Sequence, residues 1–471
     1  MNYRQDLANL VQNKSRDFCN ISDQIWEFAE SRFQEFKSSA LQAEYLTQQG
    51  FRVTQGLAGE DTAILAEFGE GKPVIALLGE FDALSGLSQE ADKTIHSPIV
   101  PGKDGHGCGH NLLGSASLAA TVALKDYMQQ HKIPGTIRYY GCPAEENAGG
   151  KAFLVRDGVF ADCDIALTWH PGTVNSVTPS GSLANFRVFY TFHGTSSHAA
   201  GAPHLGRSAL DAVEIMDVGV NYMREHMIDE ARIHYAIINT GGTAPNVVQA
   251  EAQVLYAIRA PKVTQVMDLF KRVSNCARGA ALITETNVDI RQVAAYSDYI
   301  ANDVIGSRLK ENMQAFLPIG YTEEEMEYAK GFQNVITELD RENLKREAKR
   351  LAGKNAAKIL ETPLFDFLMD GIPSRGSTDV GDVSWVVPTG QFSAVTWAAG
   401  TPGHAWQVVA QGKGPVAHKG MLFAAKVMAA TAYDFLTNPE LVVKAKASWL
   451  EELDGETYPN ALPKDAKPEI W

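Results

Sequence analysis

Five short apolar segments recur along the chain, and longer stretches with helical periodicity separate them. The segments lie at 62–68, 74–78, 136–140, 164–169 and 392–397. The run at 74–78 is continuously apolar, as in strands that are buried on both faces of a parallel sheet. Helical spacing is found at 22–50, interpreted as two helices, at 112–128 and at 419–435. This alternation predicts an α/β fold in which helices cover both faces of a mostly parallel sheet.

The middle of the chain has a different pattern, and residues 183–292 are predicted to form a separate α+β unit. Its expected elements are strand 186–192, helix 207–225, strand 233–238, strand 253–259 and helix 263–281. The unit would interrupt a larger domain made of residues 1–182 and 293–471. Within the second part, the charged stretch 321–360 is predicted to be a helical excursion that either forms a partner interface or narrows a pocket.

Composition argues against several classes of partner. The chain has 42 Lys and Arg residues against 56 Asp and Glu residues, a formal net charge of −14, so nucleic acid and anionic membranes are not expected partners. No segment reaches the ~18 apolar residues of a membrane span, and the first residues do not resemble a secretory signal. The five cysteines are too scattered for a disulfide framework. We therefore expect a cytoplasmic protein.

Ionisable side chains follow four of the predicted strands. In strand order they are Glu80 and Asp82, Glu145 and Glu146, His170, and His404. Ligands of open α/β sheets bind outside the carboxyl ends of the strands, so these side chains are expected to share one site. His170 or His404 alone would more often be an ordinary polar residue, and it is their common position that favours a function.

Cys108 and His110 lie in a glycine-rich loop directly before the helix at 112–128. The alternating glycines allow a tight turn, so that both side chains can point to one place. A thiolate and an imidazole are good metal ligands, and they favour zinc, whereas carboxylates also allow manganese. The alternative is that Cys108 is a small buried apolar residue, which such a loop does not favour.

The adjacent pair Glu145 and Glu146 could divide two tasks, with one carboxylate binding metal and the other moving protons. The alternative is a solvated loop, but the constrained turn between Cys142 and Gly150 favours a function. A cysteine hydrolase that uses Cys108 is the rival chemistry, although the many further carboxylates and imidazoles favour metal. No phosphate-binding glycine motif is present, so a nucleotide cofactor is not expected.

Several motifs in this order resemble one known family. They are Gly79-Glu80-Phe81-Asp82-Ala83-Leu84, His106-Gly107-Cys108-Gly109-His110, Glu145-Glu146, Trp169-His170-Pro171, Ser197-His198-Ala199-Ala200, the stretch 241–248, and His404. The chain resembles metallopeptidase family M20, in the amidohydrolase branch of aminoacylase-like enzymes. Three further stretches, 204–212, 377–385 and 417–421, are similar to a subgroup that acts on p-aminobenzoyl-glutamate. Asn111 stands where this branch usually has Asp, which puts one contact beside the ligands in doubt.

The resemblance implies a catalytic domain with two divalent metal ions, Mn²⁺ or Zn²⁺, and an inserted lid that also dimerises. The implied metal ligands are Cys108, His110, Glu146, His170 and His404. Glu145 would be the general base, and His198 would reach the partner's site and stabilise the oxyanion. Asn246 and Arg259 would hold the substrate carboxylate. From the residues alone, packing within the lid for His198 and an ordinary surface charge for Arg259 are equally good interpretations.

The expected activity is therefore hydrolysis of the amide bond of N-acyl amino acids, with an N-aroyl glutamate such as p-aminobenzoyl-glutamate as the expected substrate. The alternatives are an aminoacylase or dipeptidase of other specificity, and a subunit that needs a paralogous partner for activity. The expected assembly is a homodimer through the lid, or a hetero-oligomer with that paralogous chain.

Overall fold

The structure is a computed structural model that describes residues 2–179, 181–352, 361–369, 371 and 376–470. Its larger sheet has seven strands in the order β1-β2-β4-β3-β5-β11-β6. These strands are β1 (Arg52–Leu57), β2 (Glu60–Glu70), β3 (Val74–Glu80), β4 (Gly135–Cys142), β5 (Ile165–Gly172), β6 (Ser176–Val177) and β11 (Thr389–Val395). The four central strands are parallel, whereas β1, β2 and β6 join by antiparallel pairing. The prediction of an α/β fold with a mostly parallel sheet is confirmed.

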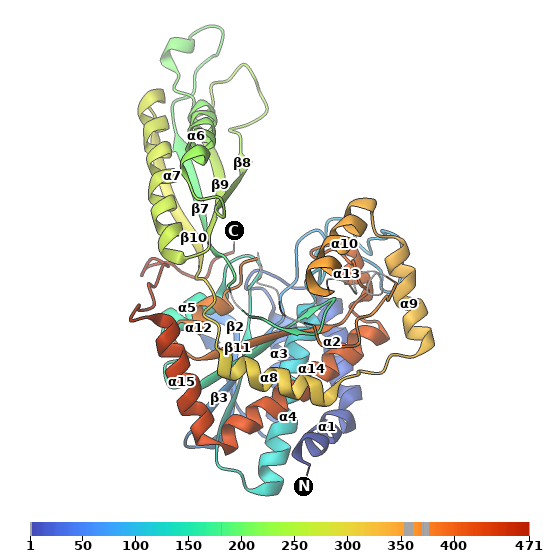
Figure 1. Cartoon of the computed structure of the whole chain (residues 1–471). Helices are drawn as coiled ribbons and strands as arrows, with labels where there is room; N and C mark the ends of the chain where they lie inside the picture. The colour runs from blue at the N-terminus through green and yellow to red at the C-terminus, as the bar shows by residue number, and fades with distance from the viewer. Residues whose placement is uncertain (1, 180, 353–360, 370, 372–375, 471) are drawn as a thin grey trace.

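Helices cover both faces of this sheet (Figure 1). The part of the chain before the second sheet contributes α1 (Tyr3–Asn13), α2 (Ser15–Phe28), α3 (Phe36–Gln48), α4 (His110–His131) and α5 (Gly150–Arg156). The part after it contributes α8 (Asp303–Phe316), α12 (Val380–Ser384), α13 (Trp406–Gln411), α14 (Pro415–Thr437) and α15 (Pro439–Leu453). The alanine-rich helices α4 and α14 are almost wholly buried and pack on each other, because small side chains allow close approach. They hold the loops at the carboxyl end of the sheet in place.

A second, four-stranded antiparallel sheet projects from this domain (Figure 1). Its elements are β7 (Ala184–His193), η1 (Pro203–Leu205), α6 (Ala209–Met223), η2 (Arg224–His226), β8 (Arg232–Asn239), β9 (Glu251–Ala260), α7 (Val263–Thr284) and β10 (Asn287–Tyr296). The strand order is β10-β7-β9-β8, and α6 and α7 pack against the sheet. We propose that this unit is the lid predicted at 183–292, with its end moved to the end of β10 at Tyr296.

The charged excursion forms two helices, α9 (Glu323–Asn334) and α10 (Glu338–Ala352), on the larger domain. Ala329 and Phe332 are buried, as the helical spacing predicts, in a small cluster that also includes Val395 and Ala398 of the larger domain. The spacing breaks at Thr337, whose hydroxyl accepts a hydrogen bond from the amide of Asp340 and starts a new helix, so Leu339 is exposed. The rest of the predicted excursion, 353–360, lies outside the described residues.

None of the helices in the described part of the chain is both long and apolar enough to cross a membrane. All five cysteines carry free thiols.

Candidate metal centre and active site

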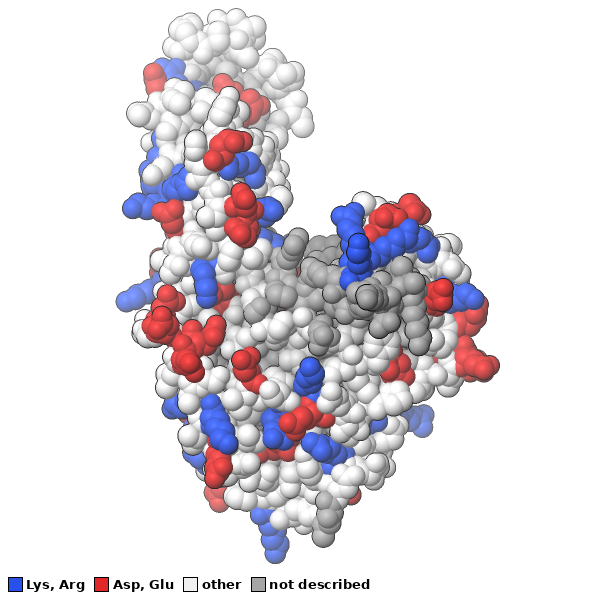
Figure 2. Space-filling view, viewed as in Figure 1, with Lys and Arg blue, Asp and Glu red and all other residues white. Residues whose placement is uncertain are grey.

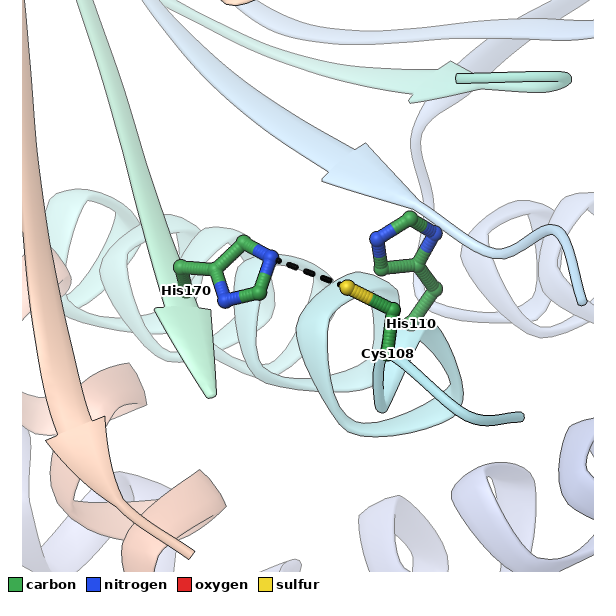
Figure 3. A group of neighbouring side chains, drawn as sticks. All are labelled: Cys108, His110 and His170. Atoms are coloured by element: carbon green, nitrogen blue, oxygen red, sulfur yellow. Dashed lines mark hydrogen bonds between the residues drawn. The ribbon is translucent and has the colours of Figure 1, made fainter. Parts of the chain in front are cut away.

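The five predicted metal ligands converge at the carboxyl end of the larger sheet. Cys108 and His110 lie where α4 begins, and Figure 3 shows His170 of β5 beside them, with Cys108 Sγ 3.3 Å from His170 Nε2. Glu146 and His404 complete the set. Two groups could each hold an ion, because their ligand atoms lie within 4.8 Å of one another: Cys108 with His110 and His170, and Cys108 with Glu146 and His404. Their role as ligands stays a prediction.

The orientation of His110 is set by a carboxylate behind it. His110 Nδ1 donates to Asp82 Oδ1 at 2.9 Å, a contact that fixes the tautomer and leaves Nε2 facing the cluster. That Nε2 atom is buried and makes no hydrogen bond, and neither does the buried Oε1 of Glu146; Nε2 lies 3.3 Å from Glu80 Oε2 and 3.9 Å from Glu146 Oε1. Buried polar atoms are rarely left without a partner, so this donor set fits divalent cations.

Burial shapes the protonation of the other ligands. It lowers the pKa of His170 to about 4, with a further effect from the nearby charge of His110, so the imidazole is neutral, as a metal ligand must be. Burial, followed by the charge of Glu146, raises the pKa of the Cys108 thiol. A nucleophilic cysteine needs a lowered pKa, so this environment disfavours the cysteine hydrolase and leaves the thiolate to be formed by a cation.

The loop that carries Glu145 and Glu146 is held by backbone hydrogen bonds. The amide of Glu146 donates to Asp82 Oδ2 at 2.9 Å, and Tyr296 Oη donates to the carbonyl of Glu145 at 2.9 Å. Glu145 belongs to a third possible cation group with Glu80 and His110. Burial, together with the charges of Glu80 and Glu146, raises the pKa of Glu145, as suits a carboxylate that must accept a proton and later donate it.

Sequence reasoning missed a buried ion cluster behind the site. Lys151 Nζ is fully buried and donates to Glu80 Oε1 and to Asp379 Oδ1, each at 2.6 Å. The charges of Lys151 and His110 lower the pKa of Glu80 against the effect of burial. No local signal pairs Lys151 with Asp379, because they are 228 positions apart. Asn111 donates to Ser22 Oγ and to the backbone carbonyl of Gly412.

The structure places the three predicted functional residues of the lid, His198, Asn246 and Arg259, at two different ends of it. Arg259 lines a cavity of about 590 Å³ together with four of the proposed ligands, so it is not an ordinary surface charge. His198 and Asn246 are exposed and adjacent at the other end of the lid, beyond the start of β9. A strand rises about 3.3 Å per residue, which places them roughly 25 Å from Arg259. Among the described residues, neither α9 nor α10 contributes to the cavity wall.

The sequence matches one protein family over most of its length. The family model described as peptidase family M20/M25/M40 matches residues 76–433. The B subunit of p-aminobenzoyl-glutamate hydrolase from Escherichia coli K12 is 44% identical over 470 residues, which cover 98% of each chain. The A subunit of the same hydrolase is 26% identical over 61% of this chain and 75% of its own length. The chain is thus similar to both subunits of one hydrolase, and much more so to the B subunit.

Two solved structures share the fold. The aminobenzoyl-glutamate utilization protein from Klebsiella pneumoniae superposes with a TM-score of 0.62 at 18% identity, covering 91% of this chain and 98% of its own. A dinuclear metal binding peptidase of the M20 family from Bacillus subtilis has a TM-score of 0.53 at 15% identity, covering 90% and 99%. At these identities the likeness shows the fold.

Proposed function

Because the chain belongs to peptidase family M20/M25/M40, and is a hydrolase of that family, we propose that it cleaves the amide bond of N-aroyl amino acids, with p-aminobenzoyl-glutamate as substrate. The observation that carries the proposal is 44% identity to one subunit of a p-aminobenzoyl-glutamate hydrolase over 98% of both chains. The position of four of the five proposed ligands in the wall of one cavity supports the chemistry. An aminoacylase or dipeptidase of other specificity is the alternative.

We propose that Cys108, His110, Glu146, His170 and His404 hold two divalent cations, with Cys108 shared between them. When bound, the cations would polarise the scissile carbonyl and lower the pKa of water. The mixture of thiolate, imidazole and carboxylate donors fits Zn²⁺ and Mn²⁺. Glu145 takes the proton from the attacking water and returns it to the amide nitrogen as the amine leaves, which is the work of one carboxyl group in two protonation states. Arg259 holds a carboxylate of the amino-acid half.

The lid supports the assembly that we propose, a homodimer. Strand β8 is the edge of the lid sheet, and its side chains Tyr235, Ile237 and Ile238 are exposed. An open apolar edge is a ready site for pairing with a second copy of the chain. The lid tip, residues 194–206 and 240–250, has no Lys, Arg, Asp or Glu and is uniformly white in Figure 2. We propose that this tip brings His198 and Asn246 to the cavity of the second copy, where His198 stabilises the oxyanion.

This assembly predicts complementation between two inactive variants. Loss of an oxyanion donor such as His198 is expected to lower kcat about 10²–10³-fold, and Glu145→Gln removes the base. In a mixed dimer of Glu145→Gln with His198→Ala, one site has both intact groups. With random exchange of protomers half of the dimers are mixed, so mixing two inactive proteins should restore about a quarter of wild-type activity. The measurement is specific activity after mixing, with each variant alone as control. No gain after proven exchange would contradict a role of His198 across the dimer.

The activity itself is tested on metal-stripped protein. We expect hydrolysis of p-aminobenzoyl-glutamate only after Mn²⁺ or Zn²⁺ is added back, measured by release of p-aminobenzoate, and full inhibition by a chelator. A panel of N-acetyl amino acids and dipeptides in the same assay separates the proposed substrate from the alternatives. Activity that survives chelation but is lost on thiol alkylation would identify a cysteine hydrolase instead.

The same assay tests for a paralogous partner chain, because the relatives include both the A and the B subunits of one hydrolase. It is run first with the purified chain and then with added cell extract. Activity that appears only with extract would show that the chain acts as part of a hetero-oligomer.

A further inference from the structure

One face of the lid sheet presents a polar patch to the cavity at the metal centre. Asn185 and Arg187 lie two positions apart on β7, so they point to the same side of the sheet. The register places Arg259 of β9 and Tyr296 of β10 directly beside Asn185. All four residues line the same cavity as four of the five proposed ligands. Only Arg259 has a role in the proposed function, as a carboxylate-binding residue.

Three side-chain oxygens in this part of the cavity have no hydrogen-bond partner within the protein, so they can bind a ligand. Ser182 is 4% exposed and Asn185 is 1% exposed, yet Ser182 Oγ and Asn185 Oδ1 have no hydrogen-bond partner. Ser377 Oγ, on the facing segment of the larger domain, is also without a partner. Leaving such groups unpaired is unfavourable by about 1–3 kcal/mol each. The hydroxyls can donate to a carboxylate, and Asn185 Oδ1 can accept from an amide N–H.

The same wall carries two guanidinium groups. Arg187 is fixed in direction, because its Nη1 donates to the carbonyl of Asn147 at 2.8 Å and its Nη2 to the carbonyl of Glu146 at 2.9 Å. Arg187 and Arg259 line the same cavity, and burial, followed by the positive charge of Arg187, lowers the pKa of Arg259. Like charges held together in a partly buried cavity repel, and an anion between them removes that penalty.

We propose that Arg187 is a specificity-determining residue that recognises a second carboxylate, so that the cavity selects N-acyl derivatives of dicarboxylic amino acids. Every N-acyl amino acid has one main-chain carboxylate, for which a single guanidinium is enough. Arg187 adds a second positive charge to the same cavity wall, next to hydroxyls that lack a partner, and this charge is complementary to a substrate that carries a second negative charge. The inference rests on the proposed function, which names the reaction, and adds the residue that selects the amino-acid half.

The test compares two substrates of nearly equal shape, p-aminobenzoyl-glutamate and p-aminobenzoyl-glutamine, in the wild-type enzyme and in Arg187→Met. We expect wild type to prefer the glutamate derivative in kcat/KM, and Arg187→Met to reduce this preference about tenfold to hundredfold by losing the glutamate reaction selectively. Arg187→Lys, which keeps the charge, should keep part of the preference. Arg291→Met, an exposed lid arginine paired with Glu469, is the matched control and should behave as wild type.

The outcomes distinguish failure of the role proposed for Arg187 from failure of the proposed function. If Arg187 only supported the Glu146 loop, both substrates would lose the same factor and the preference would not change, which overturns the inference. Equal hydrolysis of the two substrates by wild type overturns it as well, while the proposed function stands. Hydrolysis of neither substrate, with metal and cell extract supplied, overturns the proposed function and the inference together.

Discussion

Glu145→Gln is expected to lower kcat for p-aminobenzoyl-glutamate about 10²–10⁴-fold while the protein keeps its fold and its metal ions. Glutamine has the shape of the carboxylate but cannot accept a proton from water. The loop would stay in place, because the Tyr296 hydroxyl and the Asp82 carboxylate hold its backbone and not the Glu145 side chain. Steady-state kinetics with metal analysis of the purified variant measures both effects. KM should change little, because proton transfer belongs to the transition state.

The adjacent residue provides the matched control. Glu146→Gln should also be inactive, but it should lose metal, because Glu146 belongs with Cys108 and His404 in one ligand group. The comparison of metal content between the two variants is informative because Glu145 also lies in a possible cation group, with Glu80 and His110. Loss of metal from Glu145→Gln would therefore show that Glu145 is a ligand and would contradict its assignment as the base. Near wild-type turnover would refute the mechanism outright.

The convergence of the proposed ligands at one edge of the sheet was predictable, because the topology of the sheet brings them there. Strands β3, β4, β5 and β11 are parallel, so their carboxyl ends meet at one edge. Ionisable residues near these strand ends are therefore brought to the same place: His170 lies in the last part of β5, and Glu146 lies in the loop after β4. Glycines around Cys108 indicated the remaining position, since Gly109 adopts φ +76° and a Cβ there would come within 2.8 Å of the Trp397 ring.

What sequence reasoning missed depends on contacts between distant segments. Lys151 gives no sign that it is buried, because its partners Glu80 and Asp379 come from other elements. Arg187 is one of several lid arginines, and only the register of β7 against β9, which pairs Arg187 with Ala257 and Asn185 with Arg259, places it on the same cavity wall as Arg259. Asn246 and Arg259 could be assigned together from motifs, but the length of β9 puts them at opposite ends of the lid. Separation of that kind is invisible until the strands are paired.

Cys108→Ala is the second change with a large expected effect. Cys108 is the one residue that belongs to both ligand groups among the described residues, so its loss removes a donor from each proposed cation. Loss of a group that only orients a metal ligand weakens metal binding about 10–100-fold. Loss of the ligand itself, at a site with few donors, is expected to weaken metal binding more. We therefore expect metal content well below two ions per chain and turnover at background level. Metal analysis and the p-aminobenzoate assay measure the two effects.

Cys163→Ala is the matched control, because Cys163 is also a partly buried free thiol but lies against Tyr140, away from the cluster. It should keep both metal and activity. The comparison also decides between the two chemistries that the sequence left open. A nucleophilic cysteine predicts that Cys108→Ala is inactive but fully metal-loaded, whereas a shared ligand predicts that activity and metal are lost together and that excess Mn²⁺ or Zn²⁺ restores part of both. The raised pKa of the Cys108 thiol favours the second result, because only a cation in contact with the sulfur would make the thiolate stable in this buried site.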